Sequence, residues 1–573
     1  MRAWGRYFSR NAETGLKRPG AEVFLEDAPE QKLPLLALQK VAPAALEELQ
    51  ARACESERQL GSAVQVCFLC EGGKVRLEAF EPLTCTALAA LKIRVQLVGE
   101  GVLTQSQAVL QTPAGDLREM LLPRFKSAPT PLGTGQGNGW GVCCGRLAHD
   151  YAGCLRLHSQ GVPVILQVEQ AGYEQRDCLD LISGALLGRG SGLALEQLQK
   201  PCVIADLERL EEGSWLSLDS GSGQVFGQAL PIVPGVLGPE ARTLLGWADQ
   251  TRRLQVRANA STAQDLAQAL EWGAGGVGLF RMDTLILNAR QLSLFQVGLR
   301  QLWVEGLAES PELAQLTEQL ADECQNLFAV SGPLRFNMRL LDAPVSLMLR
   351  YWKEARCLPA ELSGWLHELS PTQGLRCGRL GLLLPGLWEL QMRAILRARR
   401  VQPVDLQIMV PGVCDVRELE LARQLCQRIC EQEGLDMPQL GCMLEIPRAC
   451  LGAGRLAEQA DFLSFGTGDL TETTCGISRY DAGLSFLPEM LKQGIFQHDP
   501  FQVIDQSGVG ELMRIACAQV ENRRPVLEVG ICGAQACHPA SLEFCHQLGL
   551  DYVSVPARHV PLARLVAAQA RLK

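Results

Sequence analysis

The stretch CMLEIPRACLGAGRLAEQADFLSFGTGDL, residues 442–470, decides the fold of the C-terminal half of the chain. It holds two short apolar runs, CMLEIP and FLSFGTGDL, with a segment of helical composition between them. Short apolar runs of this kind are typical of strands buried on both faces, as in a parallel sheet. The stretch therefore predicts a parallel β/α unit.

The same alternation continues from residue 245 to residue 573 and yields eight strand candidates. About 330 residues of this pattern suit a (β/α)8 barrel of the TIM type better than an open sheet. A weaker ninth candidate, GLRCGRLGL (374–382), leaves the strand numbering open. The eight candidates are LQVRANA (254–260), GVGLFRMD (276–283), LRFNMRLLD (334–342), QIMVPG (407–412), CMLEIP (442–447), FLSFGTGDL (462–470), VGICG (529–533) and DYVSVP (551–556).

Three smaller blocks precede the predicted barrel, so the chain as a whole is expected to be α/β. Residues 1–95 combine alternating segments with a helical stretch at 35–60, which predicts a small α+β unit. Residues 96–160 begin helical and then enter TPLGTGQGNGWG (130–141), whose composition predicts a linker or long loop. Residues 161–235 hold short strand-like runs and predict a compact module.

Composition excludes several classes of function. The 573 residues carry a net charge of −9 and only 5% aromatic residues, which argues against a nucleic-acid or anionic-membrane surface. No apolar run reaches the roughly 18–20 residues that span a bilayer. The 22 cysteines are scattered without a short regular spacing, which is typical of a reduced intracellular protein. We expect a cytoplasmic protein, with an organelle stroma or matrix left open.

The barrel prediction also says where chemistry should lie, because reactive groups in such barrels sit at the C-terminal ends of the strands. Arginine forks bind phosphate or carboxylate, paired carboxylates hold Mg²⁺, and a thiol can transfer a proton. Two alternatives to a functional role stay open. In one, the arginines form structural ion pairs with Asp283 and Asp342, and in the other, the thiol is an ordinary core residue. The polar residues at the predicted strand ends are Arg281, Asp283, Arg339, Asp342, Glu445, Gly466, Thr467, Gly468, Asp469 and Cys532.

Several long motifs resemble the pyruvate phosphate dikinase family of PEP-utilising enzymes. GTGDLTETTCGISRYDAGLSFL (466–487) is similar to that family's GTNDLTQ-T-GFSRDD-G-FL stretch. The other motifs that carry the resemblance are GAGGVGLFRMD (273–283), RLLDAP (339–344), CMLEIPRA (442–449), GICGAQACHP (530–539) and GLDYVSVPARHVPLARLVAAQA (549–570).

The resemblance implies a role for each matching residue in the barrel. Arg281 and Arg339 match the arginines that hold the phosphoryl group, and Arg376 and Arg379 match a further basic loop. The implied ligand is PEP or pyruvate. The remaining matches are Glu445 and Asp469 as Mg²⁺ ligands, Gly466, Thr467 and Gly468 as substrate-binding residues, and Cys532 as the proton donor.

The same resemblance extends to the N-terminal blocks. GRYFSRNAETG (5–15) is similar to a segment inside the family's ATP-grasp domain, so residues 1–95 are expected to be the C-terminal part of that domain. The family's acidic metal-binding pair there falls at Gln65 and Cys67, which are poor ligands for Mg²⁺. We therefore expect the ATP site to be lost.

The block at 161–235 resembles the family's swivelling phosphohistidine domain. Its motif corresponds to LGRGSGLALEQLQKPCV (187–203), and the histidine position falls near Gly190. The sequence contains no histidine from residue 159 to residue 366. Glycine has no nucleophile, so no phosphohistidine is expected there.

Two further departures affect the barrel. The family's Asn in GTND is Gly468, and its Glu-His pair after the cysteine is Ala534 and Gln535. A lost hydrogen-bond donor in a buried site costs about 1–3 kcal/mol, so ligand binding is better preserved than fast chemistry. We expect a catalytically impaired, dikinase-like protein that binds PEP or pyruvate with Mg²⁺ and acts in regulation or as a subunit partner, in a homodimer or heterodimer formed through the barrel. The alternatives are a phosphotransferase supplied in trans, pyruvate enolisation alone, or a scaffold without ligand.

Overall fold

A computed structural model gives the structure of the chain. It describes residues 2–573 apart from residues 27, 42, 72–73, 170–177, 179–180, 189–199, 288–290, 308, 347 and 350–372. The chain divides into two compact units. One combines Met1–Leu122, Gly235–Arg252 and Arg564–Lys573, and the other combines Pro123–Pro234 and Arg253–Ala563.

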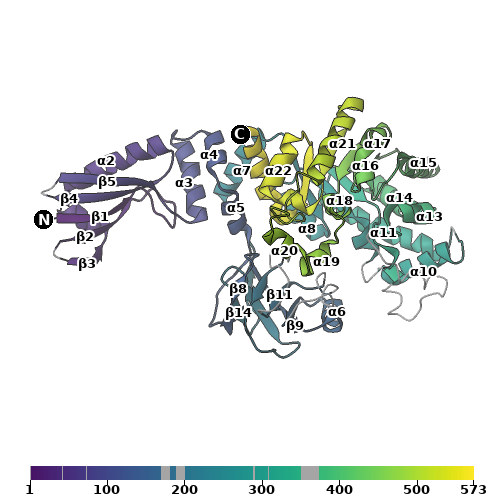
Figure 1. The fold of residues 1–573 in the computed structure, drawn as a ribbon, viewed down its shortest axis with the longest axis horizontal. Coiled ribbons are helices and arrows are strands. Elements are labelled where there is room, and N and C mark those ends of the chain that lie inside the picture. The colour runs from purple at the N-terminus through teal and green to yellow at the C-terminus, as the bar shows by residue number, and fades with distance from the viewer. Residues whose placement is uncertain are drawn as a thin grey trace. The chain divides into compact units, whose positions relative to one another are not determined.

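Eight parallel strands form a closed barrel in chain order, as the sequence predicts, and β16 pairs with β23 to close the ring. Figure 1 colours this part of the chain from teal to yellow and labels many of its helices. Each of the eight predicted runs overlaps one strand. The strands are β16 (Gln255–Ala260), β17 (Gly276–Arg281), β18 (Arg335–Arg339), β19 (Asp405–Val410), β20 (Gln439–Leu444), β21 (Phe462–Phe465), β22 (Glu528–Ile531) and β23 (Tyr552–Pro556).

The ninth candidate at 374–382 is not a strand. From Cys377 onward its residues belong to helix α13 (Cys377–Leu383). Leu380 is buried on one face of this helix, whereas Leu382 and Leu383 are exposed. Leucines on both faces of a short helix produce the same unbroken apolar run as a buried strand, which explains the ambiguity.

Helices fill the connections between the barrel strands, and polar caps begin several of them. Ser310 caps its helix by accepting a hydrogen bond from the Leu313 amide, and Gly434 ends another helix in the left-handed conformation. The helices are α8 (Ala263–Glu271), α9 (Met282–Ile286), α10 (Leu292–Trp303), α11 (Pro311–Ser331), α13, α14 (Pro385–Val401), α15 (Val416–Glu433), α16 (Pro447–Leu451), α17 (Ala453–Gln459), α18 (Thr467–Cys475), α19 (Arg479–Leu484), α20 (Leu487–Lys492), α21 (Val509–Arg523), η4 (Ala534–Cys537), α22 (Pro539–Gln547), η5 (Ala557–His559) and α23 (Val560–Leu572).

A five-stranded antiparallel sheet forms the N-terminal region, in the order β3-β2-β1-β4-β5. The alternating burial along β4 directs every second side chain into a core with α2. The elements of this region are β1 (Arg2–Phe8), β2 (Gly20–Leu25), β3 (Ala28–Leu33), α1 (Leu35–Val41), α2 (Pro43–Leu60), β4 (Val64–Glu71), β5 (Lys74–Pro82), α3 (Ala87–Gly99), α4 (Gln105–Gln111), α5 (Ala114–Leu121) and α7 (Pro239–Thr251).

An eight-stranded mixed sheet lies between residues 133 and 226, in the order β7-β14-β13-β9-β10-β11-β12-β8. The stretch 130–141, expected to be a linker or long loop, contributes the two-residue strands β7 (Gly133–Thr134) and β8 (Gln136–Gly137) to it. A Cβ on Gly135 would lie 1.9 Å from the Ile204 carbonyl oxygen, so this glycine allows close backbone approach. The other elements here are β6 (Arg124–Phe125), β9 (Val142–Ala148), α6 (Tyr151–Ser159), β10 (Val164–Val168), β11 (Gly184–Leu187), β12 (Cys202–Ile204), β13 (Trp215–Asp219), β14 (Gln224–Phe226) and β15 (Ile232–Val233).

The expectations about membrane-spanning segments and about reduced cysteines can be compared with the described residues. Among these residues, no helix combines the length and apolar character needed to cross a membrane. Every cysteine that the structure describes is a free thiol.

An ion-pair network lies at the N-terminal end of the barrel strands. Glu528 begins β22, and its carboxylate accepts hydrogen bonds from Arg257, from Arg335 at 3.0 Å and from Gln407 at 3.0 Å. Arg257 is buried, and its guanidinium lies 4.0 Å from the Tyr552 ring centre. Burial alone would raise the pKa of Glu528, but the Arg257 guanidinium lowers it below its ordinary value. The network therefore joins four strands through one carboxylate.

We predict that Glu528→Ala destabilises the protein by about 3–5 kcal/mol, because it leaves the buried Arg257 charge without its carboxylate. Urea unfolding followed by circular dichroism measures the change. The matched control is Glu458→Ala, which removes an exposed partner of Arg523 and should cost no more than about 1 kcal/mol. Because the pKa of Glu528 is lower in the folded chain, its contribution is complete above its unfolded pKa and disappears as the pH falls through the folded pKa. Equal losses in the two variants would contradict this account.

Candidate functional site at the C-terminal end of the barrel

The predicted site residues lie where the barrel strands end. Arg281 and Arg339 are the last residues of β17 and β18, and Glu445 directly follows β20. Asp469 lies in the first turn of α18 after β21, and Cys532 directly follows β22. The C-terminal ends of parallel strands meet at one end of a barrel, so the five side chains share one electrostatic environment. That environment is evident in the pKa of Glu445, which Asp469 raises and Arg339 lowers.

The centre of the site is the Asp342 carboxylate. It pairs with Arg339 Nη1 at 2.8 Å and with Arg376 Nη2 at 2.8 Å, while Arg376 Nε donates to Oδ1 at 3.1 Å. The thiol of Cys377 also donates to Asp342 Oδ1. Asp342 is 4% exposed, and although burial opposes ionisation, Arg339 and Arg376 lower its pKa. Asp342 is therefore a buried carboxylate that holds two guanidinium groups.

Arg339 is held from a second direction by Asp283. Its Nη2 donates to Asp283 Oδ2 at 3.1 Å, and Asp283 Oδ1 accepts the Asp342 backbone amide at 3.1 Å. Burial would lower the pKa of Arg339, but the Asp342 and Asp283 carboxylates raise it above the ordinary value. One open alternative from the sequence is thus realised for Arg339, which forms the structural ion pair with Asp342.

Arg281 differs from Arg339. Among the described residues, no hydrogen bond or ion pair joins the Arg281 guanidinium to another side chain, and the residue is exposed. The expected pair with Asp283 is not formed, because that carboxylate binds Arg339 and the Asp342 amide instead. Although the residue is exposed, the protein around its guanidinium replaces part of the water that stabilises the charge, and this lowers the pKa of Arg281. The neighbouring Arg339 charge lowers the pKa further. Arg281 is therefore a cation without a protein partner in the described part of the site.

Glu445 is the buried carboxyl group of the site, 2% exposed. Burial raises its pKa to about 8, and the Asp342 and Asp469 carboxylates contribute to the rise. The Gly412 amide donates to Oε1, whereas Oε2 accepts no hydrogen bond from the residues that the structure describes. A Cβ at Gly466 would lie 2.6 Å from Oε2, so a glycine is required beside this carboxylate.

The residues present fit a magnesium ion. Carboxylate oxygens are the ligands that this hard cation prefers, and Glu445 and Asp469 supply them on neighbouring strand ends. The mutual repulsion that raises the pKa of Glu445 is the electrostatic condition that a divalent cation relieves. In the structure, Arg376 Nη2 binds Asp469 Oδ2 at 3.0 Å and supplies part of that neutralisation.

The glycine-rich turn after β21 has two distinct environments. Thr467 is buried, and its hydroxyl donates to Gln535 Oε1 at 2.8 Å, while the Gln535 amide donates to the Pro500 carbonyl oxygen at 3.0 Å. Gln535 thus bonds to the turn rather than projecting towards Cys532. A Cβ at Gly468 would lie 2.3 Å from Arg479 Nη2, so a guanidinium occupies the space beside this glycine.

Cys532 lies at the same end of the barrel, 4% exposed, with its Sγ 3.7 Å from the Phe465 carbonyl oxygen. It belongs to an apolar cluster with Leu279, Met443 and other residues of the barrel interior. Burial raises the pKa of the Cys532 thiol to about 11, although the Arg339 and Arg281 charges oppose this rise. The group is therefore a protonated thiol at neutral pH. Its apolar neighbours agree with the core residue that the sequence left open, and its role as a proton donor stays a prediction.

The structure describes the expected ATP-site positions but not the expected phosphohistidine position. Gln65 and Cys67 lie on β4 and pair across the strands with Glu81 and Ala79 of β5. Gln65 Nε2 donates to Glu81 Oε2 at 3.4 Å, which leaves no paired carboxylates there. The position near Gly190, where the phosphohistidine is missing, lies outside the described residues.

Sequence analysis named Asp283 and Arg376 but not the ion pairs that they form, and it did not identify Cys377. The roles of Asp283 and Arg376 depend on the pairing of strand ends that are far apart in the sequence. Cys377 adopts φ +55°, the only positive φ among the described residues other than glycine. No local signal marks this position, because glycine is the residue that usually adopts a positive φ, and here the glycine is the next residue, Gly378.

We predict that Cys532 alkylates slowly with iodoacetamide at neutral pH, because its thiol is buried and protonated. Peptide mass spectrometry resolves its rate from that of the exposed Cys54, the internal reference. The Cys532 rate should still increase between about pH 9 and 10, since its pKa lies above the ordinary value. A rate at pH 7 equal to that of Cys54 would contradict the described environment.

Comparison with known proteins agrees with this geometry. The family described as "PEP-utilising enzyme, PEP-binding domain" matches residues 238–572, which include the whole barrel. The chain is 32% identical to pyruvate, phosphate dikinase of Rickettsia bellii, over 85% of this chain and 60% of the relative. It is 33% identical to pyruvate, phosphate dikinase 2 of Zea mays, over 99% of this chain and 70% of the relative.

A third relative extends the comparison. Pyruvate, phosphate dikinase of Giardia intestinalis is 31% identical, over 92% of this chain and 64% of the relative. The chain thus spans about two thirds of the length of the curated relatives that it matches. The chain belongs to the pyruvate, phosphate dikinase family of PEP-utilising enzymes.

Proposed function

We propose that the barrel of this chain binds PEP or pyruvate together with Mg²⁺ and does not carry out the complete dikinase reaction. The observation that supports this most directly is the unpaired Arg281 guanidinium beside Arg339 at the C-terminal end of the strands. A guanidinium fork binds phosphate or carboxylate oxygens in a bidentate manner. Arg281 is thus available to a ligand, whereas Arg339 is already oriented by two carboxylates.

The electrostatics favour an anionic ligand at this position. Arg281 and Arg339 repel each other, which is one reason why the pKa of Arg281 is lowered. A phosphate or carboxylate between them would replace that repulsion with attraction in a site partly shielded from water. The preference between PEP and pyruvate then depends on whether Arg281 requires a phosphate or accepts a carboxylate.

The cation would be held by Glu445 and Asp469. When bound, Mg²⁺ would neutralise the oxygens of the ligand and of these carboxylates. Gly412 orients Glu445 through its backbone amide, and Arg376 orients Asp469 through its guanidinium. These contacts hold the carboxylates before any ligand arrives.

Two features support the loss of the internal phosphoryl relay. The sequence from residue 159 to residue 366 contains no histidine to carry the phosphoryl group. The positions of the expected acidic pair are Gln65 and Cys67, and Gln65 bonds to Glu81 across the strands. A barrel that retains its ligand groups without the relay suits a regulatory or subunit role, in a homodimer or heterodimer formed through the barrel.

We predict that Mg²⁺ with PEP raises the melting temperature of the chain. Ligand at about 100 times its Kd stabilises the native state by roughly 2.7 kcal/mol. Arg281→Met should abolish the shift without lowering the melting temperature of the free protein, because Arg281 has no hydrogen-bond or ion-pair partner among the residues that the structure describes. The matched control is Arg300→Met, which removes an exposed arginine of α10 paired with Glu305. No shift for the unaltered chain at millimolar ligand would refute the proposal and leave only a scaffold.

A second candidate function is pyruvate enolisation, with or without phosphate delivered in trans by a partner. The supporting observation is Cys532, a protonated thiol within the electrostatic range of both Arg281 and Arg339. A protonated thiol can donate its proton to an enolate carbon, and the thiolate can take a proton from the methyl group of pyruvate in the reverse direction. The lost amide at Gly468 lowers the expected rate, because one hydrogen-bond donor is missing.

Exchange of the methyl protons of pyruvate tests the second function. If the chain enolises pyruvate, NMR in D₂O with Mg²⁺ should show replacement of the methyl protons by deuterium, and Cys532→Ser should abolish this exchange. Cys545→Ser is the control, since Cys545 is equally buried but lies in α22. Ligand-induced stabilisation without exchange would exclude enolisation and leave the binding function.

A further inference from the structure

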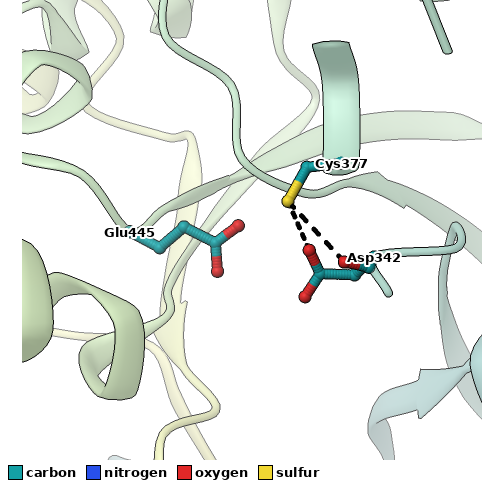
Figure 2. Close-up of side chains that lie close together, drawn as sticks. All are labelled: Asp342, Cys377 and Glu445. Atoms are coloured by element: carbon teal, nitrogen blue, oxygen red, sulfur yellow. Dashed lines mark hydrogen bonds between the residues drawn. The ribbon is translucent and has the colours of Figure 1, made fainter. Parts of the chain in front are cut away.

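Three side chains of different chemistry converge beside the proposed magnesium ligands. Figure 2 shows the Glu445 carboxylate facing the Cys377 thiol and the Asp342 carboxylate. One ligand atom from each residue lies within 4.8 Å of the other two, and all three residues are buried. Such spacing is compatible with three donors around a single cation.

The thiol is placed there by an unusual backbone conformation. Cys377 is the first residue of α13 and has φ +55°, a conformation that side chains other than glycine rarely adopt. A Cβ on Gly412 would lie 2.4 Å from Cys377 Cβ, so Gly412 makes room for this side chain. The two positions together direct a sulfur atom to the carboxylates.

The Cys377 thiol and the Asp342 carboxylate are in direct contact through a hydrogen bond. Asp342 accepts from Arg339, from Arg376 and from the thiol. A guanidinium retains its protons in a protein, whereas a thiol releases its proton to a metal. A cation that replaces the thiol hydrogen would share Asp342 Oδ1 with Arg376 Nε, whereas the pairs of Arg339 and of Arg376 Nη2 with Oδ2 would stay in place.

We propose that Cys377 joins Asp342 and Glu445 as the third donor to a divalent cation, at a site that shares Glu445 with the proposed Mg²⁺ ligands and prefers thiophilic metals such as Zn²⁺ or Co²⁺ over Mg²⁺. The inference rests on the proposed function, since it assigns the metal class of a site that overlaps the proposed one. Thiolate ligands select softer cations, whereas purely oxygen sites suit Mg²⁺. Three protein donors leave a fourth position open, the arrangement of catalytic rather than structural zinc sites.

Charge and atoms balance in this step. The thiol proton goes to solvent, and a sulfur–metal bond replaces the sulfur–hydrogen bond, with no change in oxidation state. The cation adds two positive charges and the thiolate one negative charge. Because the pKa of Glu445 is raised to about 8, this group also gives its proton to solvent when it binds the cation, so the two protons that leave balance the two positive charges that arrive.

The test is a Co²⁺ titration of the full chain, followed by the sulfur-to-cobalt charge-transfer absorption and by native mass spectrometry. Cys377→Gly is the informative variant, because glycine suits the positive φ and removes only the thiol. Cys377→Ser keeps the size of the side chain. Cys475→Ser is the matched control, since Cys475 ends α18 and is not part of the cluster.

The unaltered chain and Cys475→Ser should show the absorption with one cobalt bound at the site. Cys377→Gly and Cys377→Ser should lose it, and their Zn²⁺ affinity in competition with a chelator should fall at least about tenfold. Absorption that persists in Cys377→Gly, or none in the unaltered chain, would overturn the inference.

The result is separable from the proposed function. Stabilisation by Mg²⁺ with PEP but no cobalt–thiolate absorption would refute the role of Cys377 and leave ligand binding intact. Cobalt–thiolate absorption without any stabilisation by PEP would support the metal site and refute the binding function.

Discussion

The concentration of charge at one end of the barrel constrains everything else at this site. Asp342 is a buried carboxylate, and it remains ionised because Arg339 and Arg376 bind it from two sides. Removing either arginine would leave a buried negative charge, which is far more costly than losing an exposed ion pair. The positions of Asp469 and Cys377 follow from the same anchor, because Arg376 binds the former and Asp342 the latter. The proposed ligand site is thus preorganised by groups that the ligand need not touch.

The two ends of the barrel use charge in different ways. At the N-terminal end, Glu528 satisfies Arg257 and Arg335, and the network serves stability. At the C-terminal end, Arg281 has no partner among the described residues and Glu445 has a raised pKa, which are unfavourable conditions in the free protein. Groups left in such conditions cluster at functional sites, where a ligand relieves them. This contrast favours a binding role over a scaffold.

Much of the fold could be predicted from the sequence, and the reason is local. Buried parallel strands produce unbroken apolar runs, so all eight barrel strands could be recognised, whereas 374–382 produced the same run as helix α13. Strands β7 and β8 were missed because two-residue strands rich in glycine carry no periodic signal. The site was predicted only as a set of strand ends. That Asp283 binds Arg339 rather than Arg281 depends on side-chain geometry across strands, which no spacing encodes.

The central claim is that this end of the barrel holds a three-carbon acid and a divalent cation, although we propose that the phosphoryl relay is lost. The most direct measurement is a crystal structure of the chain grown with Mg²⁺ and PEP. The account predicts the cation on Glu445 and Asp469 and the phosphate on the Arg281 guanidinium. A site without cation or ligand at saturating concentration, with Arg281 still free of any anion, would contradict it.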